Sequence, residues 1–305
     1  MKNRPNFFII GAPKCGTTAL AHYLNEHQQV FITDPKEPHF FATDLENYRV
    51  AKSMEQYEAL FADVTGESAV GEASVFYLYS REALANIRDF NPDAKIIVML
   101  RNPVDMIPSL HGQLVYSADE NILDFEEAWY ASGDRERGEG GTKHTREIAL
   151  LNYMEMAKYA QQLQRVREWF PESQIKIIFF EDFIKDTEQC YIEVLEFLSL
   201  KYDGKKEFPI INEHTETKNT FLNTLLKRPP SFLVAIWIAA KRVLGVRKRV
   251  RVIQKLVDIN TVKTKRKPLT ETLKKEIREH YGDEVRSLAA MTGRDLDHWI
   301  GEARR

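Results

Sequence analysis

Continuous apolar runs, separated by helix-like stretches, shape the first two thirds of the chain. Asn6 to Ile10, Lys95 to Leu100 and Ile175 to Phe180 show no period-2 alternation. That pattern is typical of strands buried on both faces of a parallel sheet. Helical patterns precede the second and third runs, at Arg81 to Phe90 and Leu150 to Phe170. Strands that alternate with helices predict an α/β fold with a mostly parallel sheet flanked by helices.

The character of the chain changes from Leu225 onward. An apolar helix-like piece, Ser231 to Leu244, leads into a basic run, and a final amphipathic helical region ends near Trp299. We therefore predict a core at residues 1–224 and a helical C-terminal extension at residues 225–305, packed on the core or continuous with it.

One long connection inside the core stands out by its composition. Gly133 to Arg146 holds four glycines and many charged residues. Such a sequence predicts a mobile surface loop, and loops of this length are often lids over a site.

The composition adds bounds on the class of protein. Hydrophobic residues make up 43% of the 305 residues and charged residues 29%, as in globular proteins. No apolar run reaches 18 residues, so we expect no membrane span. The run Phe7 to Ile10 is too short for a secretory signal. The only cysteines, Cys15 and Cys190, make no disulfide framework, which favours a reducing, cytoplasmic location.

The net charge of −2 hides an asymmetry. Residues 227–267 contain 13 Lys or Arg and a single acid, which leaves 30 basic against 44 acidic residues elsewhere. This pattern indicates a local anionic partner and not a protein coated in positive charge. Residues 231–251 allow two interpretations. We favour a core helix with a solvated basic end; the other is an interfacial helix in peripheral contact with the inner face of an anionic membrane.

The loop after the first apolar run has the spacing of a phosphate-binding loop. Gly11, Gly16 and Thr18 match the pattern G-x-x-x-x-G-K-[ST]. Thr17 stands at the lysine position of that pattern, and Lys14 lies inside the loop. Backbone amides of such a loop and the helix that follows bind phosphate oxygens. The sequence thus predicts a phosphorylated ligand that is not held as kinases hold ATP.

The stretch FFIIGAPKCGTTAL resembles the 5′-phosphosulfate loop of sulfotransferases that use 3′-phosphoadenosine 5′-phosphosulfate (PAPS). The resemblance implies that Lys14 stabilises the leaving phosphate, where a fixed cation acts mainly on the transition state. It also implies PAPS contacts from the rest of the loop and the start of the helix, with Cys15 contributing its backbone amide. These residues are Cys15, Gly16, Thr17 and Thr18.

A second segment, Ile96 to Gln113, is similar to the 3′-phosphate segment of the same family. The resemblance assigns Arg101 and Ser109, eight positions apart, to the 3′-phosphate, and the planar fork of an arginine suits that group. Pro108 should disturb the helix just before Ser109. By the same resemblance, Lys218 belongs to a basic loop over the 3′-phosphate.

The segment Lys36 to Phe41, KEPHFF, resembles the acceptor side of the glycan and heparan branch of the family. That resemblance makes Glu37 the base for the acceptor and His39 a neighbouring site residue. His39 is instead the base if the enzyme works like the cytosolic small-molecule branch. Gly71 to Tyr77, GEASVFY, resembles the next family segment, but Ala73 stands where some glycan sulfotransferases have lysine.

The leading hypothesis is therefore a bacterial PAPS-dependent sulfotransferase. It would transfer a sulfuryl group to a hydroxyl or amine of a glycan, glycolipid or small alcohol and release 3′-phosphoadenosine 5′-phosphate (PAP). We expect no nucleic-acid partner and, without ligands at metal-site spacing, no metal. One alternative is a P-loop kinase-like phosphotransferase, which Thr17 argues against. The other is a non-catalytic, membrane-binding relative.

Overall fold

The computed structural model describes residues 4–211, 215–217, 261–263 and 268–302. Lys218 and residues 231–251 lie outside this part of the chain, as does the predicted boundary at residue 224. The roles predicted for them, membrane contact included, therefore stay predictions. The described residues form two compact units. The first contains 4–107, 154–211 and 271–302, and the second contains 108–153, 215–217, 261–263 and 268–270.

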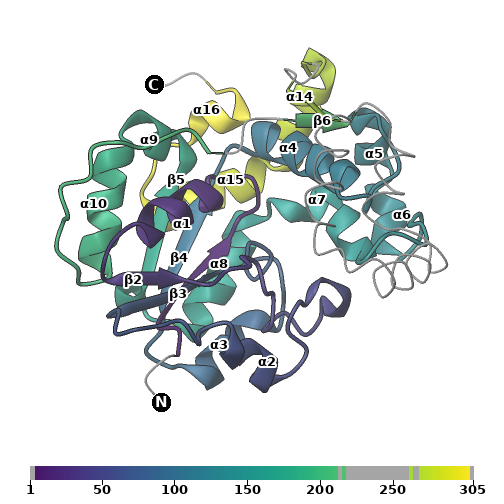
Figure 1. The fold of residues 1–305 in the computed structure, drawn as a ribbon. Helices are drawn as coiled ribbons and strands as arrows, with labels where there is room; N and C mark the ends of the chain where they lie inside the picture. Colours follow the sequence, from purple (N-terminus) through teal and green to yellow (C-terminus); the bar gives the residue numbers. More distant parts are fainter. Residues whose placement is uncertain (1–3, 212–214, 218–260, 264–267, 303–305) are drawn as a thin grey trace, which may run out of the picture. The chain divides into compact units, whose positions relative to one another are not determined.

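A five-stranded parallel sheet is the centre of the first unit (Figure 1). Its strand order is β2-β3-β1-β4-β5, and every neighbouring pair is parallel. The strands are β1 (Phe7–Gly11), β2 (Val30–Ile32), β3 (Ala69–Ala73), β4 (Lys95–Leu100) and β5 (Ile175–Phe179). All residues of β1 and β3 are buried, as expected for strands covered on both faces. The predicted α/β fold is confirmed.

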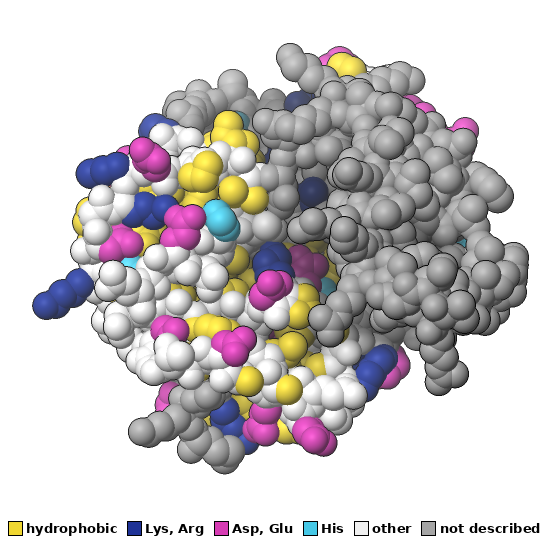
Figure 2. All heavy atoms as spheres, in the orientation of Figure 1, with side chains coloured by type: hydrophobic (Ala, Val, Ile, Leu, Met, Phe, Trp, Pro, Cys, Tyr) yellow, Lys and Arg dark blue, Asp and Glu magenta, His cyan; other side chains and the backbone are white. Residues whose placement is uncertain are grey.

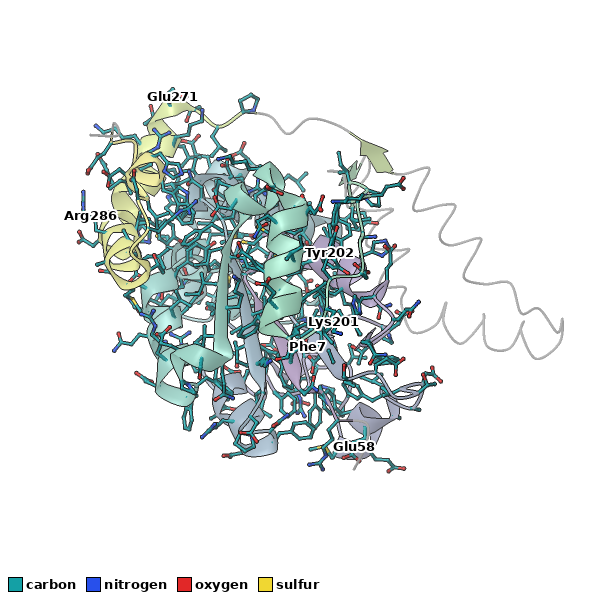
Figure 3. The ribbon with its side chains drawn as sticks, turned by 90° about the vertical axis from the view of Figure 1, so that its left-hand side faces the viewer. Phe7, Glu58, Lys201, Tyr202, Glu271 and Arg286 are labelled. Atoms are coloured by element: carbon teal, nitrogen blue, oxygen red, sulfur yellow. The ribbon has the colours of Figure 1, made fainter. Side chains whose placement is uncertain are left out.

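Two groups of helices pack in the first unit (Figures 1 and 3). In the first group, α1 contacts α10, and α10 contacts α9. Its bounds are α1 (Thr17–Asn25), α9 (Phe180–Lys185) and α10 (Thr187–Phe197). In the second group, α8 contacts both α3 and α15. Its bounds are α3 (Ala83–Phe90), α8 (Tyr159–Trp169) and α15 (Gly282–Thr292). The remaining short elements of this unit are α2 (Met54–Ala59), η1 (Glu46–Tyr48) and η3 (Glu172–Gln174).

The C-terminal helices belong to the first unit. They are α14 (Glu271–His280), α15 and α16 (Asp297–Ile300), and Figure 3 shows Glu271 and Arg286 on this outer layer. The Glu284 carboxylate accepts hydrogen bonds from the Ala160 amide at 3.0 Å and the Gln161 side chain at 2.7 Å. The buried Trp299 ring lies 5.8 Å from that of Phe179. These contacts tie the end of the chain to α8 and β5.

The helix predicted over Leu150 to Phe170 is wrong in its extent. The structure has η2 (Ile148–Leu151), α7 (Tyr153–Met156) and then α8 from Tyr159. At the break the Tyr159 amide donates to the Ala157 carbonyl at 2.7 Å. The Gln162 side chain donates to the Met156 carbonyl at 3.1 Å. This side-chain bond replaces one that an unbroken helix would supply.

Helix α4 (Pro103–Tyr116) runs from the first unit into the second and passes through Pro108 without interruption. The expected disturbance before Ser109 is therefore absent from the bounds of the helix. The second unit also contains α5 (Phe125–Tyr130), α6 (Ser132–Glu136) and η2. Strands β6 (Thr215–Thr217) and β7 (Thr261–Lys263) pair antiparallel in this unit.

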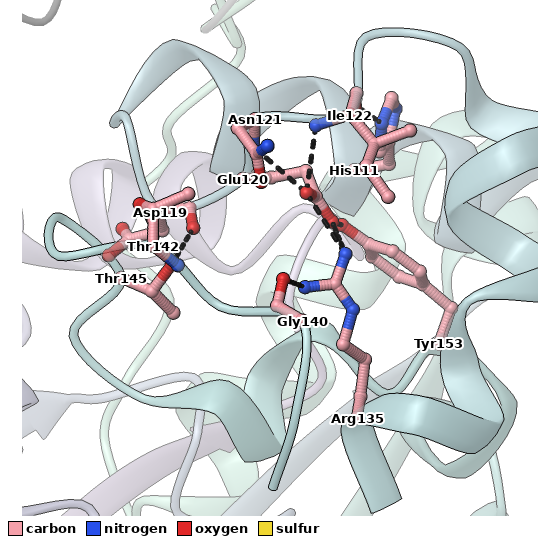
Figure 4. Close-up of polar contacts among 10 residues, drawn as sticks. All are labelled: His111, Asp119, Glu120, Asn121, Ile122, Arg135, Gly140, Thr142, Thr145 and Tyr153. Atoms are coloured by element: carbon pink, nitrogen blue, oxygen red, sulfur yellow. Dashed lines mark hydrogen bonds and ion pairs between the residues drawn. The ribbon is translucent and has the colours of Figure 1, made fainter.

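The segment Gly133 to Arg146, predicted as a mobile surface loop, is mostly exposed, but it begins within α6 and is held by ion pairs. Figure 4 shows the pair of Arg135 with Glu120. The fully buried Arg135 guanidinium lies 3.3 Å from the equally buried Glu120 carboxylate. The side chain of Arg146 pairs with Asp119 at 2.6 Å. A local pattern of glycines and charges cannot reveal such partners, which lie 15 and 27 residues away along the chain.

Candidate active site

The loop from Gly11 to Gly16 joins β1 to α1, as predicted. Gly11 has φ 146° and Gly16 has φ 89°, where side chains are strained. A Cβ on Gly11 would also lie 2.6 Å from the Val75 carbonyl oxygen. The Ala12 amide donates to the Met99 carbonyl at 2.6 Å, which fastens the loop to β4. The loop geometry thus depends on both glycines.

Helix α1 starts without a side-chain cap among the described residues. Gly16 occupies the cap position, and no acidic residue lies in the first turn. The amino end of a helix exposes amide donors and a partial positive charge, which favours an anion. Here this end follows directly on a loop that contains a lysine, so the arrangement suits a phosphate or sulfate group.

Two basic residues flank this helix end. Lys14 adopts the left-handed conformation inside the loop, with φ 61°. Arg101 follows β4, and its Nη1 donates to the Lys14 carbonyl oxygen at 3.2 Å. The Arg101 guanidinium also stacks over the Phe180 ring, 4.6 Å from its centroid. The structure therefore brings the loop and Arg101 together at the carboxyl edge of the sheet, where α/β folds bind ligands.

The other predicted loop residues have distinct environments. The side chain of Thr17 is buried, and the Thr18 hydroxyl accepts a hydrogen bond from Lys36 Nζ at 2.9 Å. The Cys15 thiol is buried and donates to the Pro13 carbonyl at 3.3 Å. Burial raises the Cys15 pKa to about 12, although the Arg101 charge opposes this. Cys15 is therefore a neutral thiol near pH 7, which agrees with a contribution through its backbone.

Glu37 and His39 form a close pair, as the acceptor segment predicted. Both adopt left-handed backbone conformations, with φ 63° and 48°. His39 Nε2 lies 3.6 Å from Glu37 Oε2, and Lys36 Nζ lies 3.4 Å from Glu37 Oε1. The His39 side chain is only 3% exposed, whereas that of Glu37 is 30% exposed. One carboxylate thus lies between two nitrogen groups, with its own side chain partly open to solvent.

The neighbours of Glu37 control its charge. Burial raises the Glu37 pKa, but the His39 ring 3.6 Å away and the charge of Lys36 outweigh that effect and bring the pKa to about 2. Glu37 is therefore ionised throughout the neutral range. Its carboxylate is available as a proton acceptor, and its basicity is weaker than that of an ordinary glutamate.

A buried carboxylate on β3 supports this pair from behind. Glu72 is fully buried and accepts hydrogen bonds from the Tyr57 hydroxyl at 2.5 Å and the Ser74 hydroxyl at 2.6 Å. Ser74 Oγ in turn accepts from the His39 amide at 3.0 Å. Burial raises the Glu72 pKa, and its hydroxyl partners and the charge of His39 oppose the rise. The chain of bonds links the interior of the sheet to the backbone of His39.

Two further bonds hold the same segment to residues 73–77. The Glu37 amide donates to the Ala73 carbonyl at 3.0 Å, and the Phe41 amide donates to the Tyr77 hydroxyl at 3.2 Å. Three amides between residues 37 and 41 are thus bound by the last residue of β3 and the stretch that follows it. The conformation of the Glu37–Phe41 segment is set by these tertiary contacts.

Most predicted site residues therefore lie along one edge of the first unit. These are Lys14, Cys15, Gly16, Thr17, Thr18, Glu37, His39 and Arg101. Ser109 is half-buried on the part of α4 that belongs to the second unit, and Lys218 lies outside the described residues. Lys36 and Glu72 have no predicted role, although both stand in the segments that resemble the family. Glu72 could have been noticed as a single acidic residue within an otherwise apolar strand, since buried carboxylates are rare and usually have partners.

Two kinds of feature are absent from the described part of the chain. It contains no group of three side chains able to hold a metal ion. Within the same residues no helix is long and apolar enough to cross a membrane. Figure 2 shows basic and acidic side chains interspersed on the described surface in that view.

Comparison with known proteins agrees with the resemblance seen in the motifs. A family model described as the sulfotransferase domain matches residues 4–235. Human heparan sulfate glucosamine 3-O-sulfotransferase 6 is 27% identical over an alignment of 218 residues; the match covers 68% of this chain and 59% of that protein. The membrane-associated sulfotransferase kil1 of Dictyostelium discoideum is 36% identical over 105 residues, 33% of this chain and 21% of that protein.

A solved structure extends the similarity over nearly the whole chain. The crystal structure of a sulfotransferase from Alicyclobacillus acidocaldarius is 29% identical, with a TM-score of 0.70. The match covers 97% of this chain and 98% of that one. By contrast, the matches span only 21% and 59% of the length of the two curated relatives above.

Proposed function

The chain belongs to the sulfotransferase domain family, and from this premise we propose that it transfers a sulfuryl group from PAPS to a hydroxyl or amine acceptor. One observation supports this more than any other. The uncapped start of α1, next to Lys14, is joined to the Glu37 carboxylate by the side chain of Lys36. One lysine side chain thus contacts both the candidate anion site, at the start of α1, and the candidate proton acceptor, Glu37.

The residues present suit the two phosphate-bearing ends of PAPS. The loop amides, Lys14 and the hydroxyls of Thr17 and Thr18 would hold the 5′-phosphosulfate. Arg101, held by the Phe180 ring and the Lys14 carbonyl, would hold the 3′-phosphate. Ser109 and Lys218 are proposed for the same phosphate from the family resemblance alone. When bound, PAPS would supply the sulfuryl group, and the remainder would leave as PAP.

The side chains would divide the work of transfer between them. Glu37 would take the proton of the acceptor as the new bond to sulfur forms. Lys14 would neutralise the negative charge that grows on the bridging oxygen as its bond to sulfur breaks. His39 is buried against Glu37 and would fix the direction of the carboxylate. With a Glu37 pKa of about 2, the proton would move only as the bond to sulfur is well formed.

For the acceptor we propose a glycan or a glycolipid. The heparan sulfate 3-O-sulfotransferases and the mouse carbohydrate sulfotransferase 15 among the relatives support this class by their names. Ala73 stands where the resemblance leads one to expect a lysine in some heparan-type members. A weakly charged sugar is therefore a better first candidate than a highly sulfated chain.

Calorimetric titration with PAP, beside ATP–Mg²⁺, tests the proposal. We expect PAP to bind and ATP–Mg²⁺ to bind much more weakly. Arg101→Ala should weaken PAP binding about 10- to 100-fold, as for a lost hydrogen bond to a charged group. Lys14→Ala should lower turnover of PAPS about 100-fold or more, with a smaller effect on PAP affinity.

Lys275→Ala is the matched control, because Lys275 is a 75% exposed lysine on α14 in the same unit. It should change neither quantity. Preference for ATP–Mg²⁺ would replace our proposal with a phosphotransferase. Binding of neither nucleotide would contradict both enzymes and favour a non-catalytic relative.

A further inference from the structure

We propose that Lys36 is a positioning residue for the transfer reaction: it holds the Glu37 carboxylate toward the amino end of α1. The inference rests on the proposed function. Lys36 Nζ donates to Thr18 Oγ1 at 2.9 Å and lies 3.4 Å from Glu37 Oε1. By these two contacts, Lys36 links α1 to the proposed base.

Lys36 shares its partial burial with Lys176 (26% exposed) and Lys205 (14% exposed), and this burial separates its contact from the most exposed ion pairs. Its side chain is 24% exposed, against 47% for Lys52 and 70% for Lys206, which also pair with glutamates. Exposed pairs contribute little because water screens the charges and both side chains lose freedom. A charged group on a mostly buried side chain, placed between a hydroxyl and a carboxylate, is screened less than one in open water and restricts the separation of its partners more.

The position of Thr18 gives this contact its consequence for catalysis. Thr18 is the second residue of α1, so its hydroxyl lies at the helix end where the sulfated phosphate is proposed to bind. Glu37 must face that end for in-line attack, because the acceptor lies between the base and the sulfur. An ammonium that contacts both groups limits the distance between them before any ligand binds.

Lys36 also affects the charge of the base. The groups that face Glu37 are Lys36 and His39 from its own segment, and Glu72 lies behind His39 on β3. The positive charge of Lys36, 3.4 Å from Glu37 Oε1, favours the ionised carboxylate. Loss of this charge should therefore raise the Glu37 pKa toward its ordinary value of 4.5.

Lys36→Met tests the inference in the full chain, since methionine keeps most of the apolar stem and removes the charge. We expect kcat with PAPS and an excess of acceptor to fall about 10- to 100-fold, the size expected when a reacting group loses its position. The affinity for PAP should change less than about threefold. The pH profile of kcat/KM should gain an acid limb between about pH 3 and 5.

Two companion variants make the result specific. Lys36→Arg keeps the positive charge and should recover a large part of kcat and the wild-type acid limb. Lys52→Met removes an exposed lysine paired with Glu46 in the same unit and should change neither. If the role of Lys36 were purely structural, Lys36→Met would lower the thermal midpoint of unfolding but would keep the wild-type pH profile of kcat/KM.

The outcomes separate this inference from the proposed function. If the wild-type chain neither binds PAP nor turns over PAPS, the proposed function fails. Titration of Glu37, followed by carbon NMR on ¹³C-glutamate-labelled protein with Glu37→Gln for assignment, then still tests the contact. If the wild type is active and Lys36→Met has the same kcat and acid limb, Lys36 has no positioning role. An unchanged Glu37 titration in Lys36→Met would overturn the inference in either case.

Discussion

Replacement of Glu37 by glutamine should make the stability of the first unit less dependent on pH. Glutamine keeps the size of the side chain and an oxygen that Lys36 and His39 can contact, so the change removes chiefly the charge. In the folded protein Glu37 has a pKa of about 2, against an ordinary value of 4.5. The folded state therefore binds the proton of this group less tightly than the unfolded chain does.

The sign and size of the effect follow from proton linkage. Because the folded pKa is depressed, the stabilising contribution is complete above the unfolded value and is lost as pH falls toward about 2. A shift of about 2.5 units corresponds to about 3.4 kcal/mol at pH 7, an upper value for a side chain that is 30% exposed. Of this, about 1.4 kcal/mol should be lost between pH 7 and pH 3.5.

Urea unfolding of the wild type and Glu37→Gln at both pH values measures the difference directly. The gap in unfolding free energy should narrow by about 1 kcal/mol at the lower pH, because only the wild type loses the contribution of Glu37. Glu279→Gln, at a 67% exposed position on α14, controls for loss of a surface charge in the same unit. A gap that stays constant or widens as pH falls would refute the charge state assigned to Glu37.

Three further changes test other parts of the structure. Arg135→Met should lower the unfolding free energy, measured with urea, by about 3 to 5 kcal/mol, because Glu120 would stay buried without its ion pair. The double variant Arg135→Met, Glu120→Leu should regain most of that free energy. A decrease below about 1 kcal/mol in the single variant would contradict the buried pair. Cys15, buried and with a pKa of about 12, should resist iodoacetamide at pH 8 in the native protein and react in urea, as read by mass spectrometry; equal rates would be inconsistent with its burial. Gly16→Ala should weaken PAP binding about tenfold in calorimetry. Residue 16 has φ 89°, and the new Cβ would lie 3.2 Å from the Phe180 ring. Unchanged binding would show that the loop tolerates a side chain there.

The parts of the fold that could be predicted from the sequence are those whose signal lies within a short stretch of the chain. The structure starts α1 at Thr17, directly after the loop where a helix is predicted, and β4 has the predicted bounds Lys95–Leu100. An apolar run, a glycine loop and a helical pattern follow one another there, and each is visible within a short window. Because these three features follow one another along the chain, the residues of the loop could be predicted from the sequence.

Strands β2 and β3 left no comparable signal. β2 has only three residues, and β3 contains Gly71 and Glu72, both unfavourable for strands by propensity. The structure explains the glycine, since a Cβ at residue 71 would lie 2.1 Å from the Phe7 ring on β1. A requirement set by a side chain 64 residues away cannot be read from either segment alone.

The two halves of the proposed site therefore depend on the sequence in different ways. The anion-binding half is a contiguous loop and helix, whereas the conformation of the Glu37–Phe41 segment is imposed by β3 and the residues after it. Burial of the Glu72 carboxylate costs free energy that an apolar side chain would not. Its two oxygens nevertheless fix the hydroxyls of Tyr57 and Ser74, and the latter binds the His39 amide. Because this cost falls on the acceptor half, loss of the Glu72 carboxylate should alter how the Glu37–Phe41 segment presents the base.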